Sequence, residues 1–303
     1  MRAAGTFRLV GWLFRPAPAT RLGVVRLLVG GYSLYYLARR RRMLAQIAET
    51  DPELFAPVGP ARLLERPLRP ATARRCTDAT LAAGVAFTLG AGHRITGPLY
   101  PALLTWTLAY RNSWSMVFHH DNLLVLHAIV LGASRGADAV SVDALARHGW
   151  RRAVSAGPAN GRYGWPLQAM NAATAATYLL AGLAKIEGEL GWRWALGSAL
   201  RRQVAVDGLR KEVFGSSASP LAYQMYRHTG IFTAMAVTSL MAELAAPVAL
   251  ISPRAGRLWA LAAFGMHWGI LAIMKVKFRY QLSGIAYLPF FDTGRLLKWR
   301  GTR

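Results

Sequence analysis

The sequence predicts an all-α protein, a polytopic bundle of about seven to eight transmembrane helices with additional interfacial helices. Hydrophobic residues make up 53% of its 303 residues, ten of which are tryptophan, and the mean hydropathy is positive. This is too apolar for an ordinary soluble domain and favours a membrane protein. The chain carries 37 Lys and Arg against 14 Asp and Glu. Its arginines cluster beside apolar runs, a placement that indicates anionic lipid as a partner and argues against nucleic acid.

The N-terminal part predicts a surface segment followed by the first span. Met1 to Arg21 is basic and broken by prolines, so we expect it to lie along the membrane surface. Leu22 to Leu37 is the first apolar run, and the four arginines at 39–42 follow it where a signal peptide would have small residues. We therefore expect a retained anchor. Arg26 within it either extends to the headgroups or pairs with an acid inside the bundle.

The middle of the chain predicts loops and short apolar arms. Arg39 to Arg75 holds nine arginines and five prolines, so we expect a loop with short interfacial helices. Asp78 to Ala91 and Gly97 to Tyr110 predict a helical hairpin. Leu123 to Gly132 is a further apolar segment, and Ser134 to Tyr163 is polar enough to predict a loop.

The C-terminal half predicts one long helix, an interfacial region and three apolar pieces. Gly164 to Ile186 is the long helix, and Glu187 to Arg227 mixes tryptophan with basic residues, as interfacial helices do. The apolar pieces and the basic tail are Thr229 to Ile251, Leu258 to Met274, Leu282 to Phe291 and Arg295 to Arg303. We expect residues 1–303 to form one transmembrane domain without a soluble C-terminal domain. The single cysteine excludes an intrachain disulfide and any multi-cysteine metal site.

The long helix carries a lysine in an unusual position. Lysine is scarce, at five residues against thirty-two arginines, and Lys185 ends an apolar run. Asn171, Thr174, Tyr178 and Lys185 fall within about 60° on a helix of 3.6 residues per turn, so they form one polar stripe that should face the interior. A desolvated lysine loses its proton more readily and can act as a base. The alternative is a lysine whose amine reaches the headgroups at the helix end.

Acidic and imidazole side chains add further candidates. Glu243 lies deep in an apolar segment, as a structural partner for Arg26 or Lys185 or as a catalytic acid. His120 and His127 are seven residues apart and share a helix face, which is not the spacing of a helical zinc motif, and no metal site is predicted. We expect the His120 imidazole to contact a substrate oxygen, with a hydrogen bond at the helix entry as the alternative.

Several of these residues carry a family resemblance. The run from Tyr178 to Glu187, YLLAGLAKIE, resembles the core motif of the vitamin K-dependent γ-glutamyl carboxylase and of the related bacterial HTTM (horizontally transferred transmembrane) proteins. Three further stretches agree in order over about residues 20 to 292. They are Arg26, Ser113-Trp114 followed by His120, and Glu243 then Pro247 ahead of His267 and the Leu288-Pro289-Phe290-Phe291 ending.

The resemblance implies a membrane enzyme of the lyase class in a bacterial cell membrane. Lys185, as the free amine, would deprotonate a reduced quinone of the vitamin K hydroquinone type, with O₂ and CO₂ as co-substrates and no metal. The resulting strong base would take a proton from carbon so that CO₂ can add to a peptide or a small molecule. His120 would steady the developing oxygen anion. The pocket would be lined by Tyr178, Glu243, His267, Arg26 and Trp114.

Two other functions remain open from the sequence. The first is a non-catalytic membrane factor for quinone binding or for peptide maturation, export or immunity, in which Lys185 and Glu243 form a buried ion pair. The second is a transporter that uses Glu243 as a proton carrier, which the lack of inverted repeats disfavours.

Overall fold

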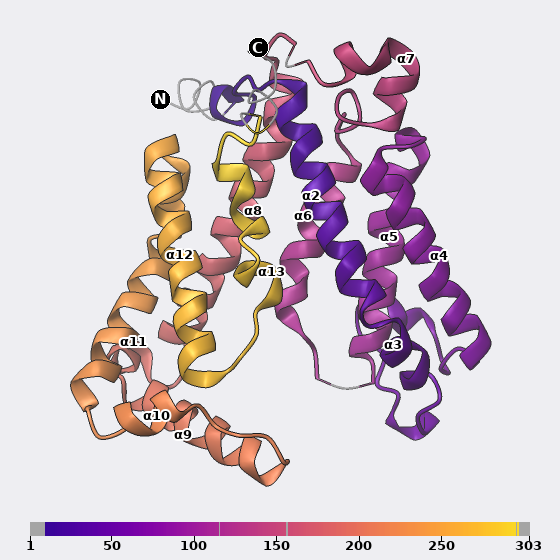
Figure 1. Ribbon diagram of the computed structural model, residues 1–303. Helices are drawn as coiled ribbons and strands as arrows, with labels where there is room; N and C mark the ends of the chain where they lie inside the picture. The colour runs from indigo at the N-terminus through magenta and orange to yellow at the C-terminus, as the bar shows by residue number, and fades with distance from the viewer. Residues whose placement is uncertain (1–9, 115, 156, 295, 297–303) are drawn as a thin grey trace. The chain divides into compact units, whose positions relative to one another are not determined.

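Helices form nearly all of the regular structure in the computed structural model, which describes residues 10–114, 116–155, 157–294 and 296 (Figure 1). No strand occurs within these ranges, where β pairing is limited to an isolated bridge between Ala17 and Asn160. The prediction of an all-α protein is therefore confirmed. The described chain packs as two units, residues 1–170 with 292–303, and residues 171–291. The chain passes from one to the other inside helix α8, and a single family domain over residues 1–303 stays a prediction.

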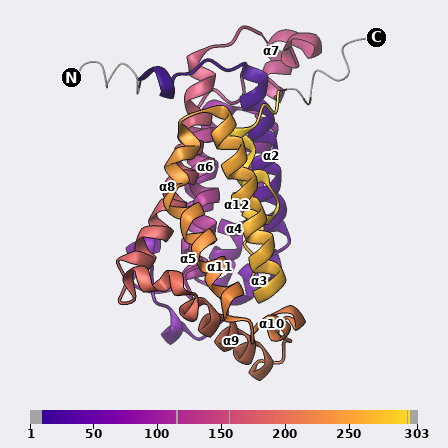
Figure 2. The ribbon, with the colours of Figure 1, turned by 90° about the vertical axis from the view of Figure 1, so that its left-hand side faces the viewer.

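The first unit is built on three helices of 20 residues each. They are α2 (Ala19–Ala38), α4 (Pro70–Leu89) and α5 (His93–Asn112). In Figures 1 and 2, α2 and α5 run beside α4. The shorter elements are α3 (Arg41–Ile47), η1 (Pro52–Leu54), η2 (Gly59–Leu63), η3 (His119–Asp121), α6 (Asn122–Gly132) and α7 (Val142–Ala153).

The α4–α5 hairpin is present, with a tighter turn and longer arms than the sequence predicted. Gly90 and Gly92 have φ of 65° and 56°, a left-handed conformation that glycine adopts without steric cost. The Asp143 carboxylate accepts hydrogen bonds from the backbone N–H groups of Gly92 and His93, which satisfies the first donors of α5. Helix α4 begins with Pro70 at its first position, where the missing N–H costs nothing.

The polar segment Ser134 to Tyr163 is not entirely a loop, because α7 occupies part of it. Ser141 has extended backbone angles and its hydroxyl accepts from the N–H of Ala144, with Asp143 in the first turn. This N-cap and the acidic first turn are ordinary helix-start signals. The expectation of a loop was wrong because it relied on polarity alone.

The second unit contains the C-terminal part of α8 (Gly161–Ile186) and the helices that follow it. The longer of these are α9 (Ser198–Val213), α11 (Thr229–Leu244) and α12 (Pro253–Met274). The shorter elements are η4 (Gly191–Leu196), α10 (Pro220–Met225), η5 (Ala246–Leu250), α13 (Arg279–Leu282) and η6 (Ile285–Phe290). Helices α11 and α12 lie side by side in Figure 2.

The prediction of seven to eight membrane spans, and with it a multi-pass membrane localisation, was wrong. Within the described residues only α12, of 22 residues, is long and apolar enough to cross a membrane. The apolar helices α6 and α11 have 11 and 16 residues, whereas a span needs about 20. The longer helices α2, α4, α5 and α8 carry too many polar residues. Overall hydrophobicity therefore overstated the number of spans.

Arg26 is fully buried in the first unit, and the described structure gives it carbonyl partners. Its guanidinium donates to the backbone oxygens of Phe87 (2.8 Å), Gly136 (3.1 Å), Val140 (2.6 Å) and Thr88. Two of these carbonyls belong to the last turn of α4, where unpaired backbone oxygens carry partial negative charge. Burial lowers the pKa of Arg26 to about 10, which leaves it charged at neutral pH. Arg26 thus joins α2 to the end of α4, in place of the acid pairing or headgroup contact considered from the sequence.

Two sequence predictions concern residues outside the described ranges. They are the basic N-terminal segment, of which residues 1–9 lie outside, and the basic tail, of which residues 295 and 297–303 lie outside.

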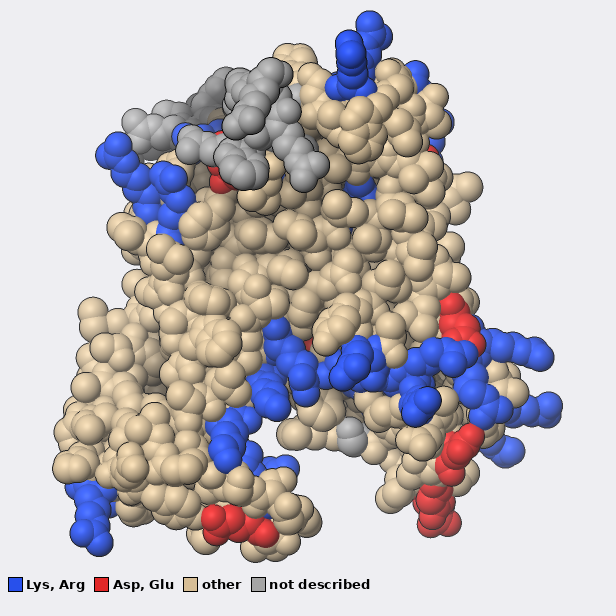
Figure 3. Space-filling model, in the orientation of Figure 1, with Lys and Arg blue, Asp and Glu red and all other residues tan. Residues whose placement is uncertain are grey.

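On the face shown in Figure 3, basic side chains far outnumber acidic ones, and broad areas carry neither.

Candidate functional site

Lys185 and Glu243 form a close ion pair in the second unit. The ammonium Nζ of Lys185 lies 2.7 Å from Oε1 and 2.6 Å from Oε2 of Glu243, and 3.3 Å from the carbonyl oxygen of Ala181. The side chains of Lys185 and Glu243 are 26% and 10% exposed. An ammonium has three protons, and these three acceptors can take all of them. The sequence left Arg26 and Lys185 open as partners of Glu243, and the partner is Lys185.

Close packing of α8 on α11 brings the pair together. A Cβ on Gly182, one turn before Lys185, would lie 3.0 Å from Cβ of Glu243 and 2.9 Å from a side-chain carbon of Leu244. Glycine therefore permits an approach that a larger residue would obstruct. The Trp194 ring lies 5.3 Å from Lys185 Nζ, a cation–π distance that stabilises the charged amine.

A second polar group, formed by Tyr178, Tyr287 and His267, is buried in the same unit. The two phenol oxygens are 2.5 Å apart, and each lies 3.3 Å from Nδ1 of His267. His267 Nδ1 is closer, at 2.9 Å, to the carbonyl oxygen of Ala263. A carbonyl can only accept, so Nδ1 carries the proton and, in the neutral ring, Nε2 is the acceptor.

Burial sets the charge of these groups. Desolvation raises the pKa of Glu243 despite the opposing effect of Lys185, so the protonated carboxyl is more accessible than at the surface. Burial raises the pKa of Tyr178 well above its usual value, and the nearby charge of Glu243 adds to this rise. The pKa of Tyr287 is also raised, by burial. Both phenols are therefore neutral at physiological pH and can donate.

The polar stripe of α8 faces the interior of the second unit, as its spacing predicts. Thr174, Tyr178 and Asn171 are buried, and the Asn171 amide donates to the carbonyl oxygen of Pro289 at 3.5 Å. Lys185 ends the stripe and is the most exposed of the four.

His120 belongs to a different polar network, in the first unit. Its Nε2 lies 3.4 Å from Oδ1 of Asp121, which is itself buried and paired with Arg111 at 2.9 Å. Tyr36 donates to the same carboxylate at 2.7 Å. The Asp121 charge is thus shared among a guanidinium, a phenol and an imidazole that is 18% exposed. This arrangement orients the imidazole ring.

The structure brings four of the seven predicted site residues into one unit. Lys185, Tyr178, Glu243 and His267 belong to the second unit, whereas Arg26, Trp114 and His120 belong to the first. Trp114 packs in a hydrophobic cluster with Tyr110 and Phe55. No group of three or more His, Cys, Asp or Glu side chains able to hold a metal occurs in the part of the chain described.

Sequence reasoning missed Tyr287, Trp194 and Trp259. Trp259 stands edge-on to Tyr178 with ring centres 4.9 Å apart, and its Nε1 donates to the carbonyl oxygen of Ala242. Tyr287 is the one tyrosine of the apolar segment Leu282 to Phe291, and this isolated phenol could have been recognised from the sequence as a candidate site residue. Trp194 and Trp259 carried no such signal, because nothing in the neighbouring sequence distinguishes them from the tryptophans of interfacial helices.

The fold and the site together define an all-α protein with a lysine–glutamate pair beside a buried tyrosine–histidine group. Comparison of the sequence with protein-family models and curated proteins, and of the fold with solved structures, found no match.

Proposed function

We propose that this protein is a quinol-dependent enzyme of the lyase class in which Lys185 is the base and Glu243 its proton partner. The observation that carries the proposal is the contact of both Glu243 oxygens with Lys185 Nζ. The resemblance of the YLLAGLAKIE run to the vitamin K-dependent carboxylase motif supplies the reaction class, with O₂ and CO₂ as co-substrates and carboxylation of a peptide or small molecule as the outcome.

In this proposal Lys185 accepts the proton of the acidic hydroxyl of a reduced quinone. Transfer of one proton from Lys185 to Glu243 leaves a neutral amine beside a neutral carboxyl, and the raised pKa of Glu243 makes this transfer less unfavourable than it would be for an exposed pair. The amine then takes a proton at Nζ from the hydroxyl of the quinol. A bound quinol supplies, on reaction with O₂, the stronger base that removes a proton from carbon. The side chain of Lys185 is 26% exposed, so it is not sealed in the interior of the second unit.

The anion-stabilising role that the family resemblance implies for His120 stays a prediction, because His120 belongs to the first unit and Lys185 to the second. The His120 ring is held by Asp121 Oδ1, and an imidazole so paired can present a proton to an oxygen anion. Tyr178 and His267 keep the pocket-lining role that the resemblance implies, and their hydrogen-bonded group with Tyr287 fixes the orientation of the Tyr178 phenol.

Arg26 and Trp114 have structural roles in this proposal. Arg26 donates to four backbone carbonyl oxygens, which we call the carbonyl cage, and Trp114 packs in the hydrophobic cluster with Tyr110 and Phe55.

A second candidate is a non-catalytic factor for quinone binding or for peptide maturation, export or immunity. The favouring observation is that Ala181 and Glu243 together offer three acceptors to the three protons of the ammonium. A fully hydrogen-bonded ammonium beside a tryptophan ring is stabilised in its charged form. In this candidate the pair orients α8 on α11 and takes no part in chemistry.

The deciding experiment gives the purified protein reduced quinone and air and measures quinone epoxide, with and without labelled CO₂. The proposal expects epoxide from the native chain, and less than about one hundredth of that rate from Lys185→Ala, since a positioned base contributes about 10² to 10⁴ in rate. Lys277→Ala is the matched control, because Lys277 is exposed and makes no ion pair in the described structure. Its rate should equal that of the native chain.

Two outcomes would reject the catalytic proposal. One is full epoxide formation by Lys185→Ala. The other is the absence of epoxide from the native chain with every quinone class supplied, together with retained quinone binding by the double variant Lys185→Met, Glu243→Leu. That second result would support the non-catalytic candidate, because an apolar pair of similar volume can replace a structural ion pair.

A further inference from the structure

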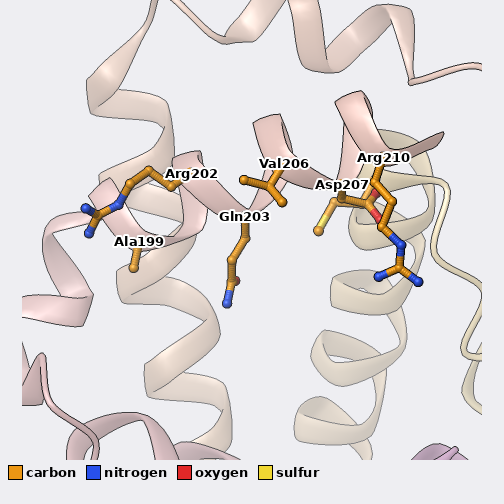
Figure 4. A pocket seen from close by; sticks show the side chains of 7 residues that line it. Ala199, Arg202, Gln203, Val206, Asp207 and Arg210 are labelled. Atoms are coloured by element: carbon orange, nitrogen blue, oxygen red, sulfur yellow. The ribbon is translucent and has the colours of Figure 1, made fainter. Parts of the chain in front are cut away.

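A hollow on α9 has an arginine at each end, and neither arginine side chain has a partner in the described part of the chain. It has a volume of about 460 Å³ and is lined by Ala199, Arg202, Gln203, Val206, Asp207, Arg210 and Met274 (Figure 4). All but Met274 belong to α9, at the spacing of one helix face. Pockets for small molecules have volumes of about 300 to 1,000 Å³, so the hollow is large enough for a ligand.

The charges of the lining leave a net positive site. Lys211 contacts the carboxylate of Asp207 and also the backbone oxygen of Met274, the last residue of α12. The charge of Asp207 is therefore neutralised within the protein, and the same lysine joins α9 to the end of α12. Arg202 and Arg210 are exposed, and neither guanidinium makes a side-chain hydrogen bond or an ion pair in the part of the chain described.

The two guanidiniums stand at opposite ends of the hollow with apolar surface between them. Eight residues separate Arg202 from Arg210, which is about 12 Å along a helix axis. Figure 4 shows their side chains pointing in opposite directions, with Gln203 and Val206 between. Val206 is 62% exposed, so it offers its methyl groups to a ligand. The free amide of Gln203 adds a hydrogen-bond donor to the same face.

We propose that this hollow binds a phosphate-bearing amphiphile. Its phosphate receives a forked pair of hydrogen bonds from Arg202 or Arg210, a geometry that guanidinium matches better than ammonium. Its hydrocarbon part lies on Val206, Ala199 and Met274. A phospholipid and a soluble phosphorylated amphiphile share this chemistry. The proposal is independent of Lys185 and of the quinol reaction.

The test measures binding of hexyl phosphate to the full-length protein by calorimetry, with inorganic phosphate and hexanol as the two partial probes. Hexyl phosphate should bind more tightly than either partial probe. The double variant Arg202→Gln, Arg210→Gln should raise its Kd about tenfold or more, as expected for loss of a charge-assisted hydrogen-bond pair. The matched control is Arg193→Gln, Arg254→Gln, which removes two exposed arginines of the same unit outside the hollow. Its Kd should match the native value.

A second variant separates the apolar contact from the charge. Val206→Ser should raise the Kd of hexyl phosphate a few-fold and leave the Kd of inorganic phosphate unchanged, because the substitution removes apolar area alone. Flotation with phosphatidylcholine vesicles, with and without phosphatidic acid, shows whether the ligand is a phospholipid or a soluble phosphorylated amphiphile. Binding that requires phosphatidic acid and both arginines indicates a lipid, and hexyl phosphate binding without flotation indicates a soluble ligand. Equal weakening by the control pair, or an unchanged Kd in Arg202→Gln, Arg210→Gln, overturns the proposal.

Discussion

Lys185 Nζ and the carboxylate of Glu243, 58 residues apart in sequence, are joined by two short hydrogen bonds of 2.7 and 2.6 Å. The pair links α8 to α11 where Gly182 permits the two helices to approach closely. Because burial opposes the charge of Glu243 while Lys185 supports it, the protonation of Glu243 depends on the balance of two opposing effects. We therefore expect the stability of this site to be sensitive to single substitutions.

Breaking the ion pair should destabilise the protein more than replacing it. Lys185→Met leaves Glu243 buried without its cation, and we expect a loss of about 1 to 3 kcal/mol, below the range for fully buried pairs because Lys185 is partly exposed. Adding Glu243→Leu should recover most of this loss. Urea unfolding of the two single variants and the double variant measures the coupling. A double variant as unstable as the sum of the singles would contradict a direct pairwise interaction.

Removing the guanidinium of Arg26 should be among the most destabilising changes in the chain. Arg26→Met removes the buried guanidinium that donates to four backbone oxygens, of which the Phe87 oxygen keeps the N–H of Gly90. We expect a loss of about 3 kcal/mol or more. Arg94→Met, at an exposed position, should change the unfolding free energy by less than about 0.5 kcal/mol. Equal effects of the two substitutions in urea unfolding would refute the carbonyl cage as a source of stability.

Two glycine substitutions should have opposite signs. A Cβ on Gly132 would lie 2.2 Å from the backbone oxygen of Gly97, so Gly132→Ala must push α6 away from α5 and should cost about 2 kcal/mol or more. Gly31 lies inside α2, and no described atom outside the neighbouring backbone of that helix lies within 4 Å of such a Cβ. Gly31→Ala should stabilise by about 0.5 to 1 kcal/mol through helix propensity. Thermal unfolding monitored by circular dichroism gives both values, and a stabilising Gly132→Ala would show that α5 and α6 do not pack this closely.

Acid should destabilise the protein through His127. This side chain is fully buried, with Nε2 3.3 Å from the carbonyl oxygen of Met170, and burial lowers its pKa from 6.5 to about 4. The unfolded chain binds the proton more readily, so stability falls as pH decreases from about 6.5 to 4, by about 3 kcal/mol in total. His127→Gln should remove this part of the pH dependence. The pKa of His93 is also lowered by burial, so a smaller slope of the same sign should remain. An unchanged slope in His127→Gln would exclude His127 as its source.

The sequence was informative wherever local spacing carried the signal. The period of Asn171, Thr174, Tyr178 and Lys185 predicted a helix with one polar face, and that face is directed to the interior. Gly92, which the predicted hairpin left between its two arms, lies in the turn between α4 and α5, whereas Gly90, which was expected inside the first arm, ends α4. The same local approach failed for membrane spans, because a high apolar content does not distinguish helices packed on each other from helices in lipid. Within the described residues only α12 combines the required length and hydrophobicity.

Sequence alone determined that the chain is helical and that Lys185, Tyr178, Glu243 and His267 are its exceptional polar side chains in apolar surroundings, since both properties depend on residue type and short-range period. Tertiary structure alone decided that Glu243 pairs with Lys185, that Arg26 is held by carbonyls, and that Tyr287 joins Tyr178. The physical reason is that a hydrogen bond requires two atoms within about 3 Å. Only the packing of helices distant in sequence brings such atoms together.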